Sequence, residues 1–316
     1  MLLDTSSLYY RAYFGVPESV RAPDGTPVNA VRGLLDFIAR LMADHRPSGL
    51  VACLDTAWRP TWRVRLIPSY KAHRVAEGTG VGTGAGGTTG NAAGEAEEAP
   101  DSLLAQVPII HEVLDALGIA RLGATDHEAD DVIGTLARRA DRPVLVVTGD
   151  RDLFQLVDDA REARVLYPRK GVGDCDVVTE EVVRERYGVP ASRYTDFAVL
   201  RGDPSDGLPG VRGIGDKTAA QLLVEYGDLA GVRAAADDPA TRLTPARRRN
   251  LLAAADYLDV APRVVRVVDD LPLPAIDPTP PTAPADPTAL SELADRWGLG
   301  GSLRRVVETL AAQSPR

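Results

Sequence analysis

Three short apolar runs of strand length lie in the first half of the chain, and each of them ends in an aspartate. They are MLLD, LVACLD and VLVVTGD, which end at Asp4, Asp55 and Asp150. Continuous apolar stretches of this length are expected for strands that are buried on both faces of a sheet. Helical spacing of apolar positions predicts helices between the runs, over residues 31–42, 103–117 and 131–139. This alternation of strands and helices predicts an α/β fold with a mainly parallel sheet flanked by helices.

The three terminal aspartates matter because functional side chains of parallel sheets collect at the carboxyl ends of the strands. We therefore expect Asp4, Asp55 and Asp150 to converge on one edge of the sheet. A single acidic turn would not produce such convergence.

From about Glu180 onward, the pattern of apolar and polar residues predicts mainly helices. The stretch GVRGIGDKTAAQLLVEYG predicts two short glycine turns followed by a helix over 217–226. Further helices are expected within 245–258 and 290–310, and residues 272–287 are rich in proline. We predict an α/β domain over 1–179, a helical subdomain over 180–270, and a proline-rich linker with a C-terminal helix over 271–316.

A low-complexity segment, GTGVGTGAGGTTGNAAG, occupies residues 78–94 and predicts a flexible loop within a 71–102 insertion. Its deletion over 79–93 should be tolerated by folding. Gly82, Gly84 and Gly87 formally fit the dinucleotide-binding pattern, but no strand precedes them and no apolar helix follows. The chain also lacks a phosphate-binding P-loop, because Asp216 stands where that motif needs a glycine.

Composition narrows the class of protein. With 316 residues, 44% of them hydrophobic, the chain can bury a sizeable core and a smaller second unit. Two cysteines are too few for a disulfide framework, and neither a signal peptide nor an apolar run of membrane-spanning length is present. We expect a soluble, cytoplasmic monomer that does not bind membranes.

The net charge of −9 argues against a nucleic-acid partner until the local distribution is considered. Residues 59–74, RPTWRVRLIPSYKAHR, hold five basic residues, no acid and two interleaved aromatics. Such a stripe can hold a phosphate backbone and stack a base, so Arg63, Arg65 and Tyr70 become candidates for DNA contact. An ordinary solvated face with half-buried aromatics is an equally good interpretation of this segment alone.

Acidic residues are crowded in DHEADD, residues 126–131, just before an apolar helical run. A solvated first turn of a helix would tolerate them, because the helix dipole favours negative charge there. Glu128 and Asp131, spaced i,i+3, would share a face, and Asp130 would point elsewhere. Seven carboxylates could meet at one sheet edge: Asp4, Asp55, Glu128, Asp130, Asp131, Asp150 and Asp152. A further pair, Asp203 and Asp206, lies in the loop LRGDPSDGLPG, which makes nine candidate ligands.

Carboxylates are hard oxygen ligands suited to Mg²⁺, and two ions roughly 4 Å apart could activate water against a phosphodiester. Without cations, so many anions would repel strongly and raise one another's pKa values. Taken singly, each acid could equally be a turn or cap residue. Their joint occurrence favours the metal site.

The glycine turns carry a separate hypothesis. Backbone amides around Gly210, Gly213 and Gly215 could approach a DNA phosphate at a helix N-terminus, with Lys217 adding a charge. Tight helix packing is the alternative explanation of these glycines.

Five ordered motifs together resemble the 5′-nuclease (flap endonuclease) superfamily, most of all the bacterial 5′–3′ exonuclease domain of DNA polymerase I and its free-standing relatives. They are LLDTSSLYYRAYF, RLIPSYKAHR, EADDVIGTLA, VTGDRDLFQLV and LRGDPSDGLPGVRGIGDKTA. The resemblance spans nearly the whole chain. It implies a PIN-like α/β fold and a helical subdomain with a helix–hairpin–helix-like motif that grips duplex DNA.

The same resemblance implies two Mg²⁺ or Mn²⁺ ions and a K⁺ ion at the Gly210–Gly215 turn. Asp4, Asp55, Glu128, Asp130 and Asp131 match ligands nearer the first ion, and Asp150, Asp152, Asp203 and Asp206 match those nearer the second. Lys71 and Arg74 match basic residues that hold the scissile phosphate, and Tyr70 matches a residue that stacks on the terminal base.

The expected activity is therefore that of a 5′–3′ exonuclease or 5′-flap endonuclease in DNA replication or repair. Expected substrates are 5′ flaps, nicked or 5′-ended duplexes and RNA–DNA hybrids. The chain is too short for an added polymerase domain, so we expect a separate protein. A small RNA-cleaving nuclease would lack the glycine turns, a non-catalytic DNA binder would tolerate missing acids, and an aspartate phosphatase would leave most of the acids unexplained.

Overall fold

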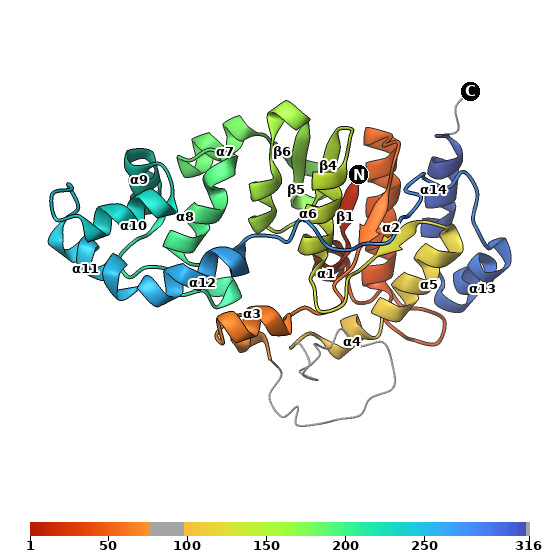
Figure 1. The fold of residues 1–316 in the computed structure, drawn as a ribbon. Coiled ribbons are helices and arrows are strands. Elements are labelled where there is room, and N and C mark those ends of the chain that lie inside the picture. The colour runs from red at the N-terminus through yellow and green to blue at the C-terminus, as the bar shows by residue number, and fades with distance from the viewer. Residues whose placement is uncertain (76–97, 314–316) are drawn as a thin grey trace.

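A six-stranded sheet forms the centre of the computed structural model, which describes residues 1–75 and 98–313 (Figure 1). The strands are β1 Leu2–Asp4, β2 Val51–Cys53, β3 Ala120–Leu122, β4 Val144–Val147, β5 Ala163–Gly171 and β6 Asp174–Val178. Their order is β3-β2-β1-β4-β5-β6, and all neighbours are parallel except β5 and β6, which are antiparallel. The predicted mainly parallel α/β sheet is confirmed, whereas β3 and the β5–β6 pair were not predicted.

The sheet separates two hydrophobic cores. Successive side chains of a strand point to opposite faces. Accordingly Leu2 and Val146 lie in one core, and Leu3 and Val147 lie in the other. Each apolar strand therefore contributes to both faces, which is why these strands have no polar alternation.

One face of the sheet is covered by helices from both ends of the chain. They are α1 Thr5–Gly15, α2 Asn29–His45, α4 Asp101–Leu104, α5 Val107–Leu117, α13 Pro287–Trp297 and α14 Gly300–Ala311. The helix predicted over 103–117 is in fact two helices. Pro108 lies in the first turn of α5, where its missing N–H is tolerated, so a new helix begins there.

The other face is covered by α6 Ala129–Arg139 and continues into the helical subdomain. That subdomain contains α7 Glu180–Tyr187, α8 Tyr194–Arg201, α9 Asp216–Tyr226, α10 Leu229–Asp237, α11 Pro245–Ala253 and α12 Ala255–Val265. Short α3, Thr61–Leu66, contacts α12. The single helix expected within 245–258 is divided between α11 and α12 at Ala254.

The proline-rich segment returns the chain to the first domain. It crosses the sheet's amino-terminal edge, where the Leu50 N–H donates to the Pro278 carbonyl over 2.7 Å. Beyond it, α13 packs against α5 and α14 packs against α2 (Figure 1). The helix expected over 290–310 is two helices, because Gly298 adopts a positive φ of 64° and ends α13.

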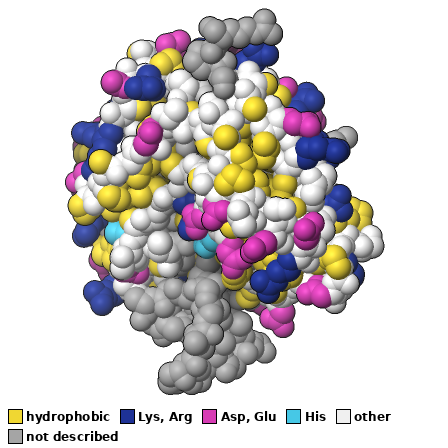
Figure 2. Space-filling view, turned by 90° about the vertical axis from the view of Figure 1, so that its right-hand side faces the viewer, with side chains coloured by type: hydrophobic (Ala, Val, Ile, Leu, Met, Phe, Trp, Pro, Cys, Tyr) yellow, Lys and Arg dark blue, Asp and Glu magenta, His cyan; other side chains and the backbone are white. Residues whose placement is uncertain are grey.

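The end of the molecule that carries α13 and α14 is shown in Figure 2. Acidic side chains gather near the centre of this face, and basic ones lie mostly toward its edges. Among the described residues on this face, basic side chains form no continuous track for a phosphate backbone.

No helix in the described ranges is long and apolar enough to cross a membrane. The glycine-rich segment 78–94 lies outside the described residues.

Candidate metal centre

Three neighbouring strands bring their terminal acids to one edge of the sheet. Asp4 is the last residue of β1, Asp55 follows the end of β2, and Asp150 follows the end of β4. Strand β1 pairs in parallel with both β2 and β4. The carboxyl ends of all three strands therefore lie side by side, and the expected convergence is observed.

A pocket of about 190 Å³ at this edge is here named the carboxylate pocket. Its lining consists of Asp4, Ser6, Ser7, Tyr10, Asp55, Trp58, Lys71, Arg74, Glu128, Asp130 and Asp150. Five of the nine candidate metal ligands and both candidate phosphate-binding residues thus share one small cavity.

Hydrogen bonds from the fold hold these acids in place. Asp4 accepts from the Ser7 N–H at 3.1 Å and from the Thr148 hydroxyl at 2.6 Å. Asp55 accepts from the Ala129 N–H at 2.6 Å, so it covers the N-terminus of α6. A carboxylate has about four lone-pair sites, so these acids retain capacity for a cation.

The acids raise one another's pKa. Burial raises the pKa of Asp4 to about 7, with Asp55 adding to the shift. Burial and then Asp150 raise the pKa of Asp130 well above its usual range. The pKa values of Asp150 and Asp152 are also raised, chiefly by burial and then by neighbouring carboxylates. Such a site favours either a proton or a bound cation.

The acids are not arranged as a ready-made chelate. Among the described residues, no group of three or more His, Cys, Asp or Glu side chains lies close enough together to hold one ion directly. This spacing suits a cation that keeps much of its water, as Mg²⁺ commonly does.

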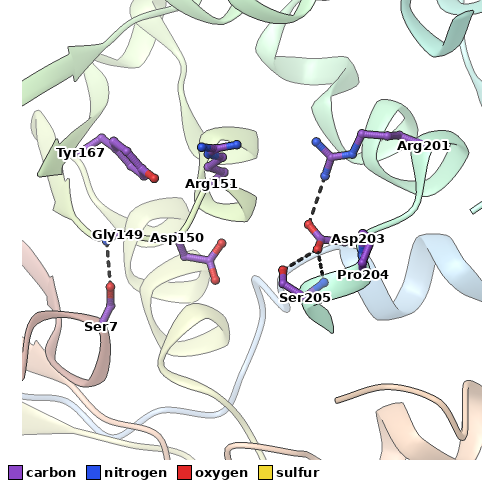
Figure 3. A pocket seen from close by; sticks show the side chains of 9 residues that line it. All are labelled: Ser7, Gly149, Asp150, Arg151, Tyr167, Arg201, Asp203, Pro204 and Ser205. Atoms are coloured by element: carbon purple, nitrogen blue, oxygen red, sulfur yellow. Dashed lines mark hydrogen bonds and ion pairs between the residues drawn. The ribbon is translucent and has the colours of Figure 1, made fainter. Parts of the chain in front are cut away.

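A second group of acids lies across Asp150, in a loop that follows α8. Asp203 lines a neighbouring pocket (Figure 3). The Arg74 guanidinium donates to Asp206 at 3.0 Å. Burial and then Asp150 raise the pKa of Asp152 most, and Asp206 and Asp203 raise it further. The second group is therefore within electrostatic reach of the first.

The loop is fixed against the segment that carries Lys71. The Lys71 N–H donates to the Asp206 carbonyl at 2.9 Å, and the Ser69 hydroxyl donates to the Gly207 carbonyl at 2.8 Å. Gly207 has a φ of 67°, and a Cβ there would overlap the Ser69 carbonyl oxygen. Only glycine permits this close approach, which joins the helical subdomain to the sheet edge that carries the acids.

Lys71 is buried beside the acids. Its ammonium forms an ion pair with Glu128 and donates to the Trp58 carbonyl at 3.3 Å. Burial opposes the charge most, but Glu128, Tyr70 and Asp206 together outweigh it, and the pKa of Lys71 lies well above its ordinary value. The ammonium is therefore a permanent positive charge at the wall of the carboxylate pocket.

Two predicted roles are corrected by a buried ion pair. The Arg63 guanidinium donates to both oxygens of Asp131, at 2.7 and 2.8 Å, and to Glu128 at 3.2 Å. Arg63 is 3% exposed and Asp131 is fully buried. Arg63 therefore exposes almost no surface that DNA could contact, and both oxygens of Asp131 are already engaged, because its Oδ1 also accepts from the Val268 N–H.

The stacking role of Tyr70 is corrected as well. Its ring is buried, and its hydroxyl donates to Glu128 at 2.7 Å. A base cannot reach such a ring, so Tyr70 orients Glu128 instead. The aromatic spacing of RLIPSYKAHR reflected packing at this position.

The remaining candidates for DNA contact are divided between surface and interior. Arg65, Gly213, Gly215 and Lys217 are exposed, the last three at the start of α9. Gly210 is different: its φ is 62°, and a Cβ would lie 2.5 Å from the Arg201 carbonyl oxygen. Tight packing, the alternative left open above, explains Gly210.

Sequence reasoning missed several polar residues at the site. Thr148 and Ser7 position Asp4, and the Ser7 hydroxyl also accepts from the Gly149 N–H at 2.8 Å. Arg151 and Arg201 line the pocket that contains Asp203 (Figure 3). Their places inside VTGDRD and LRGD, next to candidate ligands, were the available signal.

Comparisons with known proteins agree with this geometry. Residues 1–188 match the family model "5′-3′ exonuclease, N-terminal resolvase-like domain", and residues 189–285 match "5′-3′ exonuclease, C-terminal SAM fold". The 5′-3′ exonuclease of Streptomyces coelicolor is 64% identical over 312 residues, which cover 99% of this chain and all of that protein. DNA polymerase I of Mycobacterium tuberculosis is 38% identical over 99% of this chain, which spans 32% of that longer protein.

A solved flap endonuclease of bacteriophage T5, in complex with DNA and metal ions, has a similar fold. Its TM-score is 0.64 at 16% identity, with 99% of this chain and 98% of that chain covered. At this identity the likeness concerns the fold. The two family models together span most of the chain, and the sequence relatives match over nearly its full length. The chain belongs to the 5′–3′ exonuclease family.

Proposed function

We propose that the protein hydrolyses DNA as a metal-dependent 5′–3′ exonuclease and 5′-flap endonuclease, using two divalent ions. The observation that carries this proposal is the carboxylate pocket, where acids from three strand ends and α6 share a wall with Lys71 and Arg74. Hard oxygen donors beside fixed positive charge suit a phosphodiester bound together with cations.

The donor set fits Mg²⁺ or Mn²⁺. Candidate ligands of the first ion are Asp4, Asp55, Glu128 and Asp130, and those of the second are Asp150, Asp152, Asp203 and Asp206. Burial and then neighbouring carboxylates raise the pKa values of Asp4, Asp130 and Asp150, and these shifts support cation binding because a bound cation stabilises the ionised carboxylates. When bound, such ions lower the pKa of water and stabilise charge that develops on phosphate oxygens.

The chain itself supplies binding and orientation. Lys71 is held on the pocket wall by Glu128, and Arg74 is held by Asp206 and the Ser205 carbonyl. A phosphate entering between them would accept charge-assisted hydrogen bonds from both side chains. The two residues approach from a segment that the Gly207 loop fixes, so their positions are set before the substrate arrives.

The substrate class and setting are part of the same proposal. We infer a DNA partner with a 5′ flap, a nick or a free 5′ end, and an RNA–DNA hybrid as a further substrate. Exposed Gly213, Gly215 and Lys217 at the start of α9 support duplex binding through backbone amides and one charge. A K⁺ ion at this turn, a cytoplasmic monomer, and a role in replication or repair complete the proposal.

A single assay tests the activity. A 5′-flap, a nicked duplex and an RNA–DNA hybrid, each labelled at the 5′ end, are incubated with Mg²⁺, with Mn²⁺ or with a chelator. We expect release of 5′-terminal products with either ion and none with chelator. Cleavage that persists in chelator would refute the metal dependence, and intact substrates under all conditions would refute the nuclease function.

A further inference from the structure

A second pocket, here named the flanking pocket, lies beside the carboxylate pocket and has a volume of about 510 Å³ (Figure 3). The two pockets share Ser7 and Asp150. A DNA strand whose phosphate lies in the carboxylate pocket can therefore continue past Asp150 into the flanking pocket. The volume lies within the range of about 300–1,000 Å³ typical of small-ligand pockets.

The walls of the flanking pocket carry cationic, aromatic and acidic groups. Tyr167 and Arg151 lie on one side and Arg201 on the other, with Asp150 between them (Figure 3). Arg201 is already engaged, because it donates to Asp203 at 3.1 Å and to the Gly202 carbonyl at 2.9 Å. The acids that face the pocket, Asp150 and Asp203, are both candidate ligands of the second ion.

Arg151 is the arginine of this pocket that has no carboxylate partner among the described residues. It is exposed, and among the described residues it forms no ion pair, whereas Arg74 and Arg201 each have a carboxylate partner. Its guanidinium donates a hydrogen bond to the neighbouring Tyr167 hydroxyl, and an arginine keeps its positive charge in proteins. Its side chain does not cap the following turn, η2 Asp152–Leu156.

Tyr167 is positioned rather than free. Its ring meets Phe154 edge-on at 5.5 Å between centroids, and the Arg11 guanidinium lies 5.7 Å from the ring centre. The ring is half-buried and lines the pocket. An ordered aromatic edge beside an unpaired arginine is a common way to hold a nucleotide, by stacking and by a phosphate contact.

We propose that the flanking pocket binds the nucleotide adjacent to the scissile phosphate, with Arg151 holding its backbone phosphate and Tyr167 contacting its sugar or base. This inference rests on the proposed nuclease function and adds a subsite to it. Arg151 is a positioning residue: it holds the strand across Asp150, on the side away from Lys71. The recognised group is a phosphate diester, so the subsite does not depend on the base sequence.

The test replaces single phosphates by uncharged methylphosphonates. A set of 5′-flap substrates carries one methylphosphonate each, at successive positions on both sides of the cleavage site. For the unchanged protein we expect kcat/KM to fall about tenfold at one position adjacent to the scissile phosphate, as for loss of one charge-assisted hydrogen bond.

Arg151→Gln should lower kcat/KM on the all-phosphate substrate by a similar factor and abolish the penalty at that position. It should also make the salt dependence of binding shallower by about one phosphate contact. Tyr167→Phe should keep the positional pattern, since the ring remains. Arg304→Gln, at an exposed residue of distant α14, is the matched control and should behave as the unchanged protein.

The inference is overturned if Arg151→Gln retains the full positional penalty, or if no position next to the cleavage site shows one. Both results require an unchanged protein that cleaves the all-phosphate flap. An unchanged protein that cleaves nothing would instead refute the proposed function, so the two failures are distinguishable.

Discussion

At the scale of single residues, two adjacent aspartates in the first turn of α6 have opposite environments. Asp130 lines the carboxylate pocket, and Asp131 is fully buried with Arg63. Consecutive helical residues point about 100° apart, so one helix turn serves both the site and the core. Helical spacing predicts that the two side chains point in different directions, but it does not say which of them faces the pocket.

Asp130→Asn is expected to reduce cleavage to less than about one-hundredth, the scale typical of losing one electrostatic group at a reacting centre. Folding should be unaffected, since a neutral amide matches the proton-bound form that burial favours. Cleavage rates at saturating Mg²⁺ and thermal unfolding in chelator measure the two effects. Undiminished cleavage would remove Asp130 from the proposed site.

Asp131→Asn is the matched variant with the reverse outcome. It leaves the buried Arg63 charge without its bidentate partner, which costs about 3–5 kcal/mol of unfolding free energy. Urea unfolding measures this loss, and activity per folded molecule should be largely kept. A variant as stable as the unchanged protein, but inactive, would restore Asp131 as a metal ligand.

Lys71→Ala should slow cleavage far more than it weakens duplex binding. Glu128 would keep its contacts with Arg63 and Tyr70, so the pocket wall should stay formed. Single-turnover rates and equilibrium binding to a duplex separate the two effects. Equal losses in both would make Lys71 a docking residue only.

At the scale of elements, one loop decides whether the two halves of the site meet. Residues 203–208 follow α8 in the helical subdomain, yet their carbonyls accept hydrogen bonds from the Lys71 N–H and the Ser69 hydroxyl. Gly207 makes this contact possible by its positive φ and its lack of a Cβ. The loop therefore joins Asp203 and Asp206, proposed ligands of a second ion, to the segment that carries Lys71.

Gly207→Ala should destabilise the fold by at least about 1–2 kcal/mol, the cost of a left-handed backbone for a residue with a Cβ. It should also lower kcat, because the loop cannot remain docked on Ser69. Gly300→Ala, in α14 with no atom near its Cβ position, is the control and should be neutral or slightly stabilising. Equal unfolding curves for both variants would show that the loop has room to adjust.

Strands and helices that show a clear local pattern of apolar residues were predicted well. The strands β1, β2 and β4 and the helices α2, α6 and α9 all begin and end close to the expected residues. The β5–β6 pair was missed because its strands lie at the end of the sheet, where polar and apolar residues mix. Helix breaks at 105–106, 254 and 298–299 were missed because helical spacing of apolar residues continues across them.

At the scale of the whole molecule, the crowded acids link stability to pH and metal. The pKa of Asp4 is about 7 in the fold against 3.8 for an ordinary aspartate. Its contribution to stability is therefore complete below about pH 4 and is lost as the pH rises through 7. Without metal, the melting temperature should fall between pH 6 and pH 8.

Divalent ions should reverse this loss, because they bind the ionised acids of the folded chain. We expect Mg²⁺ or Mn²⁺ to raise the melting temperature more at pH 8 than at pH 6. Asp4→Asn should show a smaller dependence on both pH and metal. A melting temperature that is equally metal-sensitive at both pH values in both proteins would contradict the linkage.

The sequence by itself determined the α/β class, the sheet edge and the acids gathered there. Parallel strands place their carboxyl ends together whatever their order, so an acid after each apolar run is enough to predict convergence. Lys71 and Arg74 were assigned to the site in a different way, through the resemblance of RLIPSYKAHR to a known motif.

Only the tertiary structure decided which charged residues face the pocket and which neutralise one another inside the protein. Arg63 meets Asp131 across 68 residues, and Arg74 meets Asp206 across 132. Pairings over such distances follow from how helices and loops pack, and composition or spacing cannot encode them locally. For that reason the sequence was enough to identify the acidic residues. The tertiary structure was needed to show which of them are candidate ligands, which are ion-pair partners and which line the two pockets.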